Sequence, residues 1–284
     1  MQKDEKKKLR IFSKQIQMKT IETIAGIGIG HVGGALSIAD LLAVLYGKQM
    51  KIDPKHPAWE ERDWLVVSKG HAGPAVYSAL ALKGYFPMEQ LDTLNRCGTR
   101  LPSHCDRNLT TGIDITTGSL GQGASSAAGV ALGLKMSGKD NRVYLVLGDG
   151  EIEEGQVWEM AMFAAAKKLG NLIAFVDNNK LQIDGEVDEL CALGDIGLKF
   201  EAFGWNSRTV DGHDVESIDA AVEEAKKQTD KPTMIVLHTV KGKGWSEIEG
   251  KVGSHSRTIS QEDKERALKE MRQALQAIEE GDAE

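Results

Sequence analysis

Cysteine is scarce in this sequence of 284 residues, and its few cysteines are not paired by spacing. Cys97, Cys105 and Cys191 are odd in number and form no CxxC motif, which argues against a disulfide framework and against a zinc site. Long apolar runs are also missing: no stretch reaches the length of a membrane span, and no signal-peptide core follows the charged N-terminus. We therefore expect a cytoplasmic protein that has no membrane partner.

An excess of positive charge is missing as well. The formal net charge is −7 at pH 7, and the basic run from Lys6 to Lys8 lies among acids in a helical pattern. A nucleic-acid-binding surface is therefore not expected. The chain is long enough to bury a substantial core, and no repeat, linker or low-complexity segment divides it, so we expect one domain over residues 1–284.

Short apolar runs alternate with helical patterns along the whole chain. Strands are predicted at residues 64–67, 143–147, 172–176, 205–210 and 233–239. Helices are predicted at residues 5–25, 37–46, 124–136, 157–169, 195–203, 215–228 and 261–279, and a further helix ends at residue 83. Ser37 and Ser260 are the expected N-caps of two of these helices. The alternation indicates an α/β fold with one open, mostly parallel sheet and helices on both faces.

The stretch at residues 143–185 combines two strands and a helix with acidic and amide side chains. The first strand ends at a GDG turn that contains Asp149, and the second ends at a DNN turn that contains Asn179. Because parallel strands place their carboxyl ends on one edge of a sheet, we expect Asp149 and Asn179 to lie close together. Their oxygens suit Mg²⁺, and the helix start after Gly150 suits phosphate groups. GDG alone is equally well explained as a simple turn.

A glycine-rich segment around His31 formally contains GxGxxG, from Gly28 to Gly33. A dinucleotide-binding fingerprint follows a strand and opens a helix, whereas this segment follows a long helical pattern. We expect instead a loop that allows the backbone and His31 to approach a ligand closely.

Several separate motifs together resemble one family. GIGHVGGALS, VVSKGHAGPAVYSAL, TTGSLGQG, GDGEIEEG and DNNKLQIDG are similar to motifs of transketolase, over roughly residues 16–255. The resemblance implies the thiamine diphosphate-binding fold, specifically its diphosphate-binding domain. It also implies the transfer of a two-carbon ketol unit from a ketose donor to an aldose acceptor, with thiamine diphosphate and Mg²⁺ as cofactors.

The resemblance also implies roles for individual residues. The implied Mg²⁺ ligands are Asp149, Asn179 and the carbonyl of Leu181. The implied cofactor-binding residues are His71, Gly118, Ser119, Leu120, Gly150, Glu154, Asn179 and His255. The implied catalytic residues are His31, His71, His104 and His255. Of these, His31, His104 and His255 would surround the sugar, and His71 would lie near the diphosphate. Imidazoles suit such a site, since they can donate to hydroxyl groups and exchange protons near neutral pH.

Other polar residues have simpler interpretations. His56, His213 and His238 are expected to be packed or surface residues. Glu151 and Glu153 fit plain acids in the first turn of a helix. Lys241 and Lys243 fit solvated loop charges, and a phosphate-facing role for them is a weaker hypothesis.

The resemblance covers one domain of the family, and we expect its two further domains, a pyrimidine-binding domain and a C-terminal domain, on a partner chain. The resemblance therefore implies that the partner is a C-terminal transketolase subunit, in an α₂β₂ assembly that acts on sugar phosphate substrates. Two other hypotheses remain open from the sequence. One is the α subunit of a 2-oxoacid dehydrogenase E1 component, and the other is a non-catalytic scaffold or regulatory subunit that retains the fold.

Overall fold

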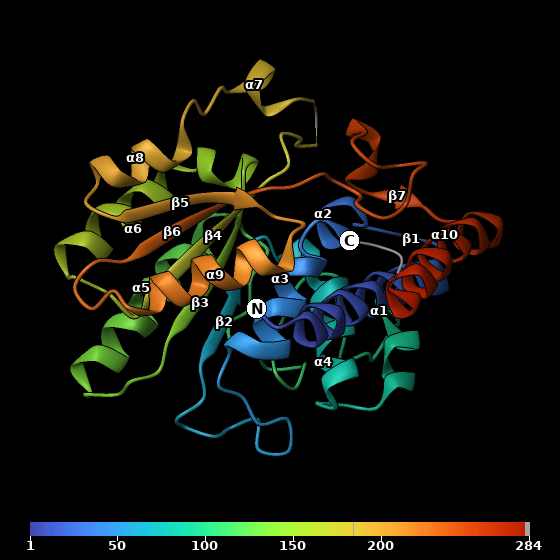
Figure 1. Cartoon of the computed structure of the whole chain (residues 1–284), viewed down its shortest axis with the longest axis horizontal. Helices are drawn as coiled ribbons and strands as arrows, with labels where there is room; N and C mark the ends of the chain where they lie inside the picture. Colours follow the sequence, from blue (N-terminus) through green and yellow to red (C-terminus); the bar gives the residue numbers. More distant parts are fainter. Residues whose placement is uncertain (184, 282–284) are drawn as a thin grey trace.

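The computed structural model describes residues 1–183 and 185–281, so Asp184 of the DNNKLQIDG motif lies outside the described residues. A five-stranded parallel sheet crosses the middle of the molecule in the order β2-β3-β4-β6-β5 (Figure 1). Its strands are β2 (Trp64–Val67), β3 (Val143–Gly148), β4 (Leu172–Asn178), β5 (Asn206–Asp211) and β6 (Thr233–His238). The predicted α/β fold and the strand-helix-strand unit at its centre are confirmed.

Helices cover both faces of this sheet because successive strand residues point to opposite sides. Tyr144 and Val146 of β3 pack with one group of helices, and Leu145 and Leu147 pack with the other. The first group is α1 (Lys3–Ile27), α3 (Ala39–Val44), α4 (Gly73–Lys83), α9 (Val215–Lys226) and α10 (Gln261–Glu280). The second group is α5 (Gln122–Met136), α6 (Gly155–Ala166) and α8 (Ile196–Ala202). Both faces of the strands are therefore buried, as their continuous apolar runs predict.

The remaining elements are short. They are β1 (Ile29–Gly30), α2 (Gly33–Leu36), the π-helix η1 (Leu45–Gln49), the 3₁₀-helices η2 (Gly70–Ala72), η3 (Met88–Thr93), η4 (Gly150–Glu153) and η5 (Val252–Ser254), α7 (Val187–Leu190) and β7 (Arg257–Thr258). Strands β1 and β7 pair in antiparallel fashion, Ile29 with Thr258 and Gly30 with Arg257. The sequence did not predict this pair. It joins the glycine-rich loop of His31 to the loop of His255.

The predicted N-cap at Ser37 is wrong, whereas the one at Ser260 is confirmed. Ser37 has helical backbone dihedrals between α2 and α3; its hydroxyl donates to Asp177 Oδ2 at 2.6 Å and lies 3.2 Å from the Gly34 carbonyl oxygen. The local pattern could not reveal this partner, because Asp177 lies on β4. Ser260 accepts from the Asp263 amide and forms a capping box at the start of α10.

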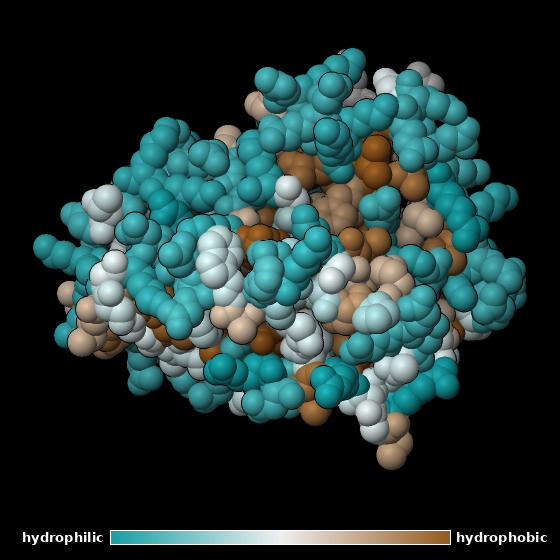
Figure 2. Space-filling view, turned by 90° about the horizontal axis from the view of Figure 1, so that it is seen from below, coloured by the Kyte–Doolittle hydropathy of each residue, from teal (hydrophilic) through white to brown (hydrophobic). Residues whose placement is uncertain are grey.

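No helix in the described part of the chain is long and apolar enough to cross a membrane. Figure 2 shows one face of the molecule, where apolar residues gather in and around a hollow and hydrophilic residues surround them.

Candidate active site

A cavity of about 230 Å³ lies at the carboxyl ends of the central strands. Strand β2 is followed by Lys69 and His71, β3 by Asp149, β4 by Asn179, and β6 by Lys241, and all five residues line the cavity. The expected proximity of Asp149 and Asn179 is therefore confirmed. The predicted site residues that line the cavity are His31, His71, His104, Gly118, Leu120, Asp149, Gly150, Asn179, Leu181 and His255.

Two predicted site residues lie outside this lining. Ser119 is exposed, and its carbonyl accepts from the Gln122 amide at 3.2 Å. Glu154 is exposed at the start of α6, close to Gly121, where an added Cβ would be 3.2 Å from the Glu154 Cβ. Both residues flank the cavity without lining it.

Hard oxygen atoms from two segments, the turn after β3 and the turn after β4, meet in the cavity. Asp149 is 2% exposed, and its carboxylate accepts from the amides of Gly150 at 2.9 Å and Lys180 at 2.5 Å. Asn179 Nδ2 donates to Asp177 Oδ2 at 2.9 Å, which turns the amide oxygen of Asn179 away from that carboxylate. With the Leu181 carbonyl, these groups form a set of one carboxylate and two neutral oxygens, the chemistry that Mg²⁺ prefers.

The charge of the site is consistent with a metal that shares its coordination with a ligand. Among the described residues, no group of three or more His, Cys, Asp or Glu side chains is placed to hold a metal ion. A cation held by Asp149, Asn179 and Leu181 would therefore need further oxygens, and diphosphate oxygens are suitable donors. Burial, and then the charge of Asp177, raises the pKa of Asp149 to about 6, and a nearby cation would oppose this shift.

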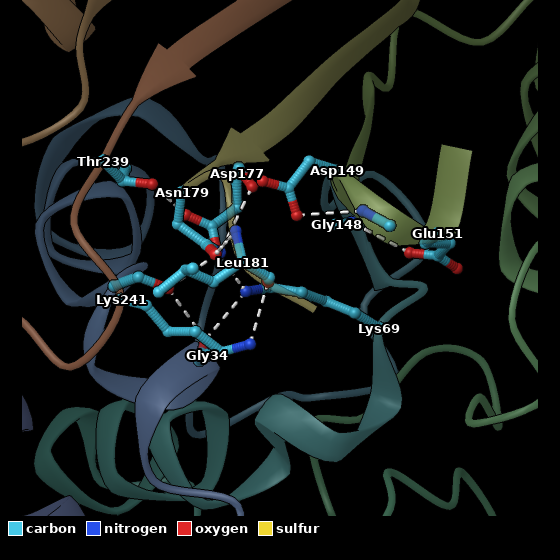
Figure 3. A network of polar contacts seen from close by, with 12 residues as sticks. Gly34, Lys69, Gly148, Asp149, Glu151, Asp177, Asn179, Leu181, Thr239 and Lys241 are labelled. Atoms are coloured by element: carbon cyan, nitrogen blue, oxygen red, sulfur yellow. Dashed lines mark hydrogen bonds and ion pairs between the residues drawn. The ribbon is translucent and has the colours of Figure 1, made fainter. Parts of the chain in front are cut away.

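Asp177 is the centre of the buried polar network in Figure 3. Lys69, which is 1% exposed, donates to Asp177 Oδ2 at 2.5 Å and to the Gly34 carbonyl at 2.7 Å. The hydroxyl of Thr239 donates to the other carboxylate oxygen of Asp177. Burial by itself would raise the pKa of Asp177, but the Lys69 ammonium holds it below its usual range. The network fixes the orientation of Asn179 beside the proposed metal position.

Glu151 forms a second buried contact between loops of the site, so its interpretation as a plain acid of the first turn is wrong. Its side chain lines the cavity, is 2% exposed, and accepts from the amides of Gly121 and Gly148, each at 3.0 Å. The hydroxyl of Ser68 donates to the same carboxylate. Burial raises the pKa of Glu151. One side chain thus joins the end of β2, the loop before α5 and the end of β3.

Four imidazoles gather in the lining of the cavity. The ring centroid of His31 lies 5.5 Å from that of His71, 5.5 Å from that of His104 and 5.3 Å from that of His255. The ring centroids of His71 and His255 are 4.9 Å apart. These residues come from four distant parts of the sequence, so their convergence is a strong sign of a functional site.

The environment keeps these imidazoles neutral. Burial, and then the charge of Lys69, lowers the pKa of His71 to about 2, and burial, and then the charge of Lys241, lowers the pKa of His255 to about 4. Burial also lowers the pKa values of His31 and His104. At neutral pH the resting rings of His71 and His255 are therefore neutral, and the implied catalytic roles of the four imidazoles stay a prediction. As neutral rings they can each donate one hydrogen bond and accept another.

Close backbone contacts shape the cavity wall at two glycines. Gly118 has φ +140°, and an added Cβ would lie 2.9 Å from the His104 ring. A Cβ at Gly70 would lie 2.6 Å from the backbone carbon of Thr117. Larger residues at these positions would push the segment of Thr117 and Gly118 away from the loops that carry His71 and His104.

The other histidines lie outside the cavity lining, as the sequence indicated. His56 is exposed and contacts Asp53 at 2.7 Å. His213 contacts Asp40 at 2.9 Å and accepts from the Val240 amide. His238 is exposed at the end of β6.

Sequence reasoning missed Lys69, Glu151 and Asp177, and gave Lys241 only a weak role. Their positions at strand ends were a usable signal, since ligand sites of parallel sheets form there. Their burial and pairing were not visible, because each partner is distant in sequence or on another element.

Comparison with known proteins gives a consistent result. Residues 9–276 match the family model described as transketolase, thiamine diphosphate binding domain. The chain belongs to the transketolase family. One relative, the 6-deoxy-6-sulfo-D-fructose transketolase subunit SqwG of Clostridium sp. (strain MSTE9), is 56% identical over 87% of this chain and 90% of its own length. Another, an apulose-4-phosphate transketolase subunit of Phocaeicola vulgatus, is 35% identical over 95% of this chain and 96% of its own length.

Solved transketolases share the fold. The Campylobacter jejuni transketolase superposes with a TM-score of 0.86 at 32% identity, over 96% of this chain and 43% of the solved chain. The transketolase of Pichia stipitis in complex with sedoheptulose-7-phosphate gives 0.86 at 30% identity, over 97% of this chain and 46% of that chain. This chain thus spans less than half of the solved enzymes. The predicted fold and family are confirmed, and neither the dehydrogenase nor the scaffold hypothesis is favoured.

Proposed function

We propose that this chain is the subunit of a two-chain transketolase that binds the diphosphate and metal of thiamine diphosphate. The complete enzyme would transfer a two-carbon ketol unit from a ketose to an aldose. The observation that carries this proposal is the single cavity that joins Asp149, Asn179 and the Leu181 carbonyl to four neutral imidazoles. One half of the cavity suits a metal diphosphate, and the other suits a hydroxylated substrate.

In this proposal, Asp149, Asn179 and Leu181 hold Mg²⁺, while His71 and Gly150 lie near the diphosphate. When bound, thiamine diphosphate supplies the nucleophilic carbon and the electron sink of the reaction. The segment from Gly118 to Leu120 would line the position of the cofactor rings. Its shape depends on the positive φ of Gly118 and on the contact with His104.

The imidazoles act on the sugar. His31, His104 and His255 present neutral rings that donate to or accept from hydroxyl and carbonyl oxygens of the substrate. The low pKa values of these rings favour positioning and hydrogen-bond exchange over permanent positive charge. A ring can still take up a proton in passing when an alkoxide-like oxygen is near it.

The partner in this proposal is a C-terminal transketolase subunit with the pyrimidine-binding domain, in an α₂β₂ assembly. Two observations support it: the solved transketolases named above are more than twice as long, and the two curated relatives named above, which are about as long as this chain, are called subunits. The exposed positions of Ser119 and Glu154 beside the cavity leave both residues accessible to that partner. We place the assembly in the cytoplasm, where the free thiols of Cys97, Cys105 and Cys191 would stay reduced.

The donor is proposed to be a ketose with an anionic group at its far end. The relatives named above act, by their names, on a sulfonated fructose and on a phosphorylated sugar. The greater identity to the first makes 6-deoxy-6-sulfo-D-fructose the first donor to test, with a ketose phosphate as the second.

The proposal is tested by mixing this chain and its C-terminal partner with thiamine diphosphate, Mg²⁺, each donor and an aldose phosphate. We expect a two-carbon-shortened aldose from the donor only when both chains and the cofactor are present. Full activity from this chain alone, or none from the assembled pair with any ketose, would contradict it.

A further inference from the structure

The two lysines of the segment Lys241-Gly-Lys-Gly244 have opposite environments. Lys241 is 2% exposed and lines the cavity, whereas the Lys243 side chain is 36% exposed and forms an ion pair with Glu249 at 2.8 Å. Gly242, with φ +79°, lies between them. The sequence alone could not separate their roles.

The Lys241 side chain is guided into the cavity by the first glycine-rich loop. An added Cβ at Gly33 would lie 2.9 Å from Lys241 Cγ and 2.5 Å from the Ser254 carbonyl. The Gly33 carbonyl also accepts from the Gly242 amide at 3.0 Å. Glycine at position 33 is thus required for the path of this side chain, which makes the placement of Lys241 part of the architecture of the site.

The Lys241 ammonium contacts the same carbonyl that we propose as a metal ligand. Its Nζ donates to the Leu181 oxygen at 2.9 Å (Figure 3). Within residues 1–183 and 185–281, no carboxylate lies within ion-pair distance of Lys241, whereas Lys69 is paired with Asp177 at 2.5 Å. An ammonium has three donors, so Lys241 retains capacity for an anion in the cavity.

We propose that Lys241 couples the binding of the divalent cation to the binding of the diphosphate. This inference deepens the proposed function and rests on it. A fixed positive charge at the Leu181 carbonyl repels a bare cation that seeks the same oxygen. The same charge attracts a diphosphate. The cation is therefore disfavoured alone and favoured together with the anion, and this coupling is reciprocal.

The charges of the cavity support this coupling. Burial lowers the pKa of Lys241 to about 8, and the charge of Asp149 opposes this shift. The proposed cation would also interact with Asp149, so the two positive charges would compete for one carboxylate. A diphosphate between them would relieve the competition. Lys69 is less suited to this role, because its ammonium is already paired with the Asp177 carboxylate and also donates to the Gly34 carbonyl.

The test uses Lys241→Met, which removes the charge and keeps most of the stem, with Lys243→Met as the matched control. Calorimetry would measure binding of Mn²⁺ alone, of inorganic pyrophosphate alone, and of each in the presence of the other. We expect Lys241→Met to bind Mn²⁺ several-fold more tightly and pyrophosphate about tenfold or more weakly, since a charged hydrogen bond is lost. Lys243→Met and Lys241→Arg should stay close to the wild type.

Tighter binding of Mn²⁺ together with weaker binding of pyrophosphate distinguishes coupling from a structural role of Lys241. A purely structural lysine would weaken both ligands when substituted, and that result would overturn the inference, as would no change in either. If Lys241→Met unfolds at a much lower temperature, Lys241→Gln replaces it with the same expectations. Failure of the wild-type chain to bind pyrophosphate would also overturn the inference, even if the assembled enzyme transfers ketol units.

Discussion

Two charged cavities lie at opposite ends of the strands of the central sheet, one at the carboxyl ends (the carboxyl edge) and one at the amino ends (the amino edge). Their charged side chains differ in the partners that they have. The cavity at the amino ends of the strands is larger, about 530 Å³ against about 230 Å³. Several of its charged groups have neighbours as partners: Lys139 pairs with Glu60 at 2.7 Å, and Lys226 donates to the Gln49 carbonyl at 2.8 Å. At the carboxyl edge, Lys241 and the imidazoles retain hydrogen-bonding capacity. Cavity size alone therefore does not identify the functional site.

Helix direction explains the contrast. Helices that follow β3 and β2 begin at the carboxyl edge, so their free amides face the site and favour anions there. Helices that precede the strands end at the amino edge, where free carbonyls attract cations. Lys135 donates to the carbonyls of Lys167 and Lys168, and Arg142 to that of Lys226. The lysines and arginine of the amino edge thus have a structural explanation.

The largest expected difference in cofactor binding and activity is between substitutions of Asp149, at the carboxyl edge, and Asp140, at the amino edge. Asp149→Asn removes the carboxylate from the proposed metal set, so metal-dependent binding of thiamine diphosphate and ketol transfer should fall by about a hundredfold or more. Asp140→Asn, in the amino-edge cavity, should leave both within about twofold. Titration calorimetry and initial rates of the assembled enzyme measure the two effects. Equal behaviour of the two variants would remove the distinction between the edges.

A second comparison uses two buried carboxylates that each accept two backbone amides. Glu151 accepts from Gly121 and Gly148, and Asp63 accepts from Lys51 and Arg142, at the opposite edge. Glu151→Gln and Asp63→Asn should each lower the free energy of unfolding by about 1–3 kcal/mol. Cofactor affinity should fall only for Glu151→Gln. Denaturant unfolding and calorimetry together check this, and weaker cofactor binding by the Asp63 variant would count against it.

The smallest expected effect is on the pH dependence of stability. The pKa of His71 is lowered from 6.5 to about 2, so the unfolded chain binds a proton that the folded chain does not between these values. Stability should therefore fall as the pH drops below about 6.5, by at most about 1.4 kcal/mol per pH unit from this group. Asp149, whose pKa is raised to about 6, contributes the opposite slope, so variants must be compared with the wild type.

Substitution of His71 tests that contribution. His71→Asn should lose less stability than the wild type between pH 6.5 and pH 5 in denaturant unfolding. His56→Asn, on the exposed loop near the amino edge, provides the control and should follow the wild type closely. An unchanged slope in the His71 variant would show that this imidazole is protonated in the folded chain.

The difference between local patterns and contacts of distant segments explains how much of the fold and of the site the sequence could predict. The strand-helix-strand unit and the meeting of Asp149 with Asn179 followed from apolar runs and from the topology of parallel sheets. The predicted N-cap at Ser37 was wrong because the Ser37 hydroxyl donates to Asp177, which is distant in sequence. Glu151 looked like a surface acid because burial depends on loops brought in from distant segments. Local patterns predict elements, whereas paired buried charges require the assembled fold.

The most direct test of the account is a calorimetric titration of thiamine diphosphate into this chain, alone and with its C-terminal partner, in Mg²⁺ and then in chelator. We predict binding that requires the metal and becomes much tighter when the partner is present. No binding by the assembled pair under any of these conditions would contradict the assignment of the carboxyl-edge cavity as the cofactor site.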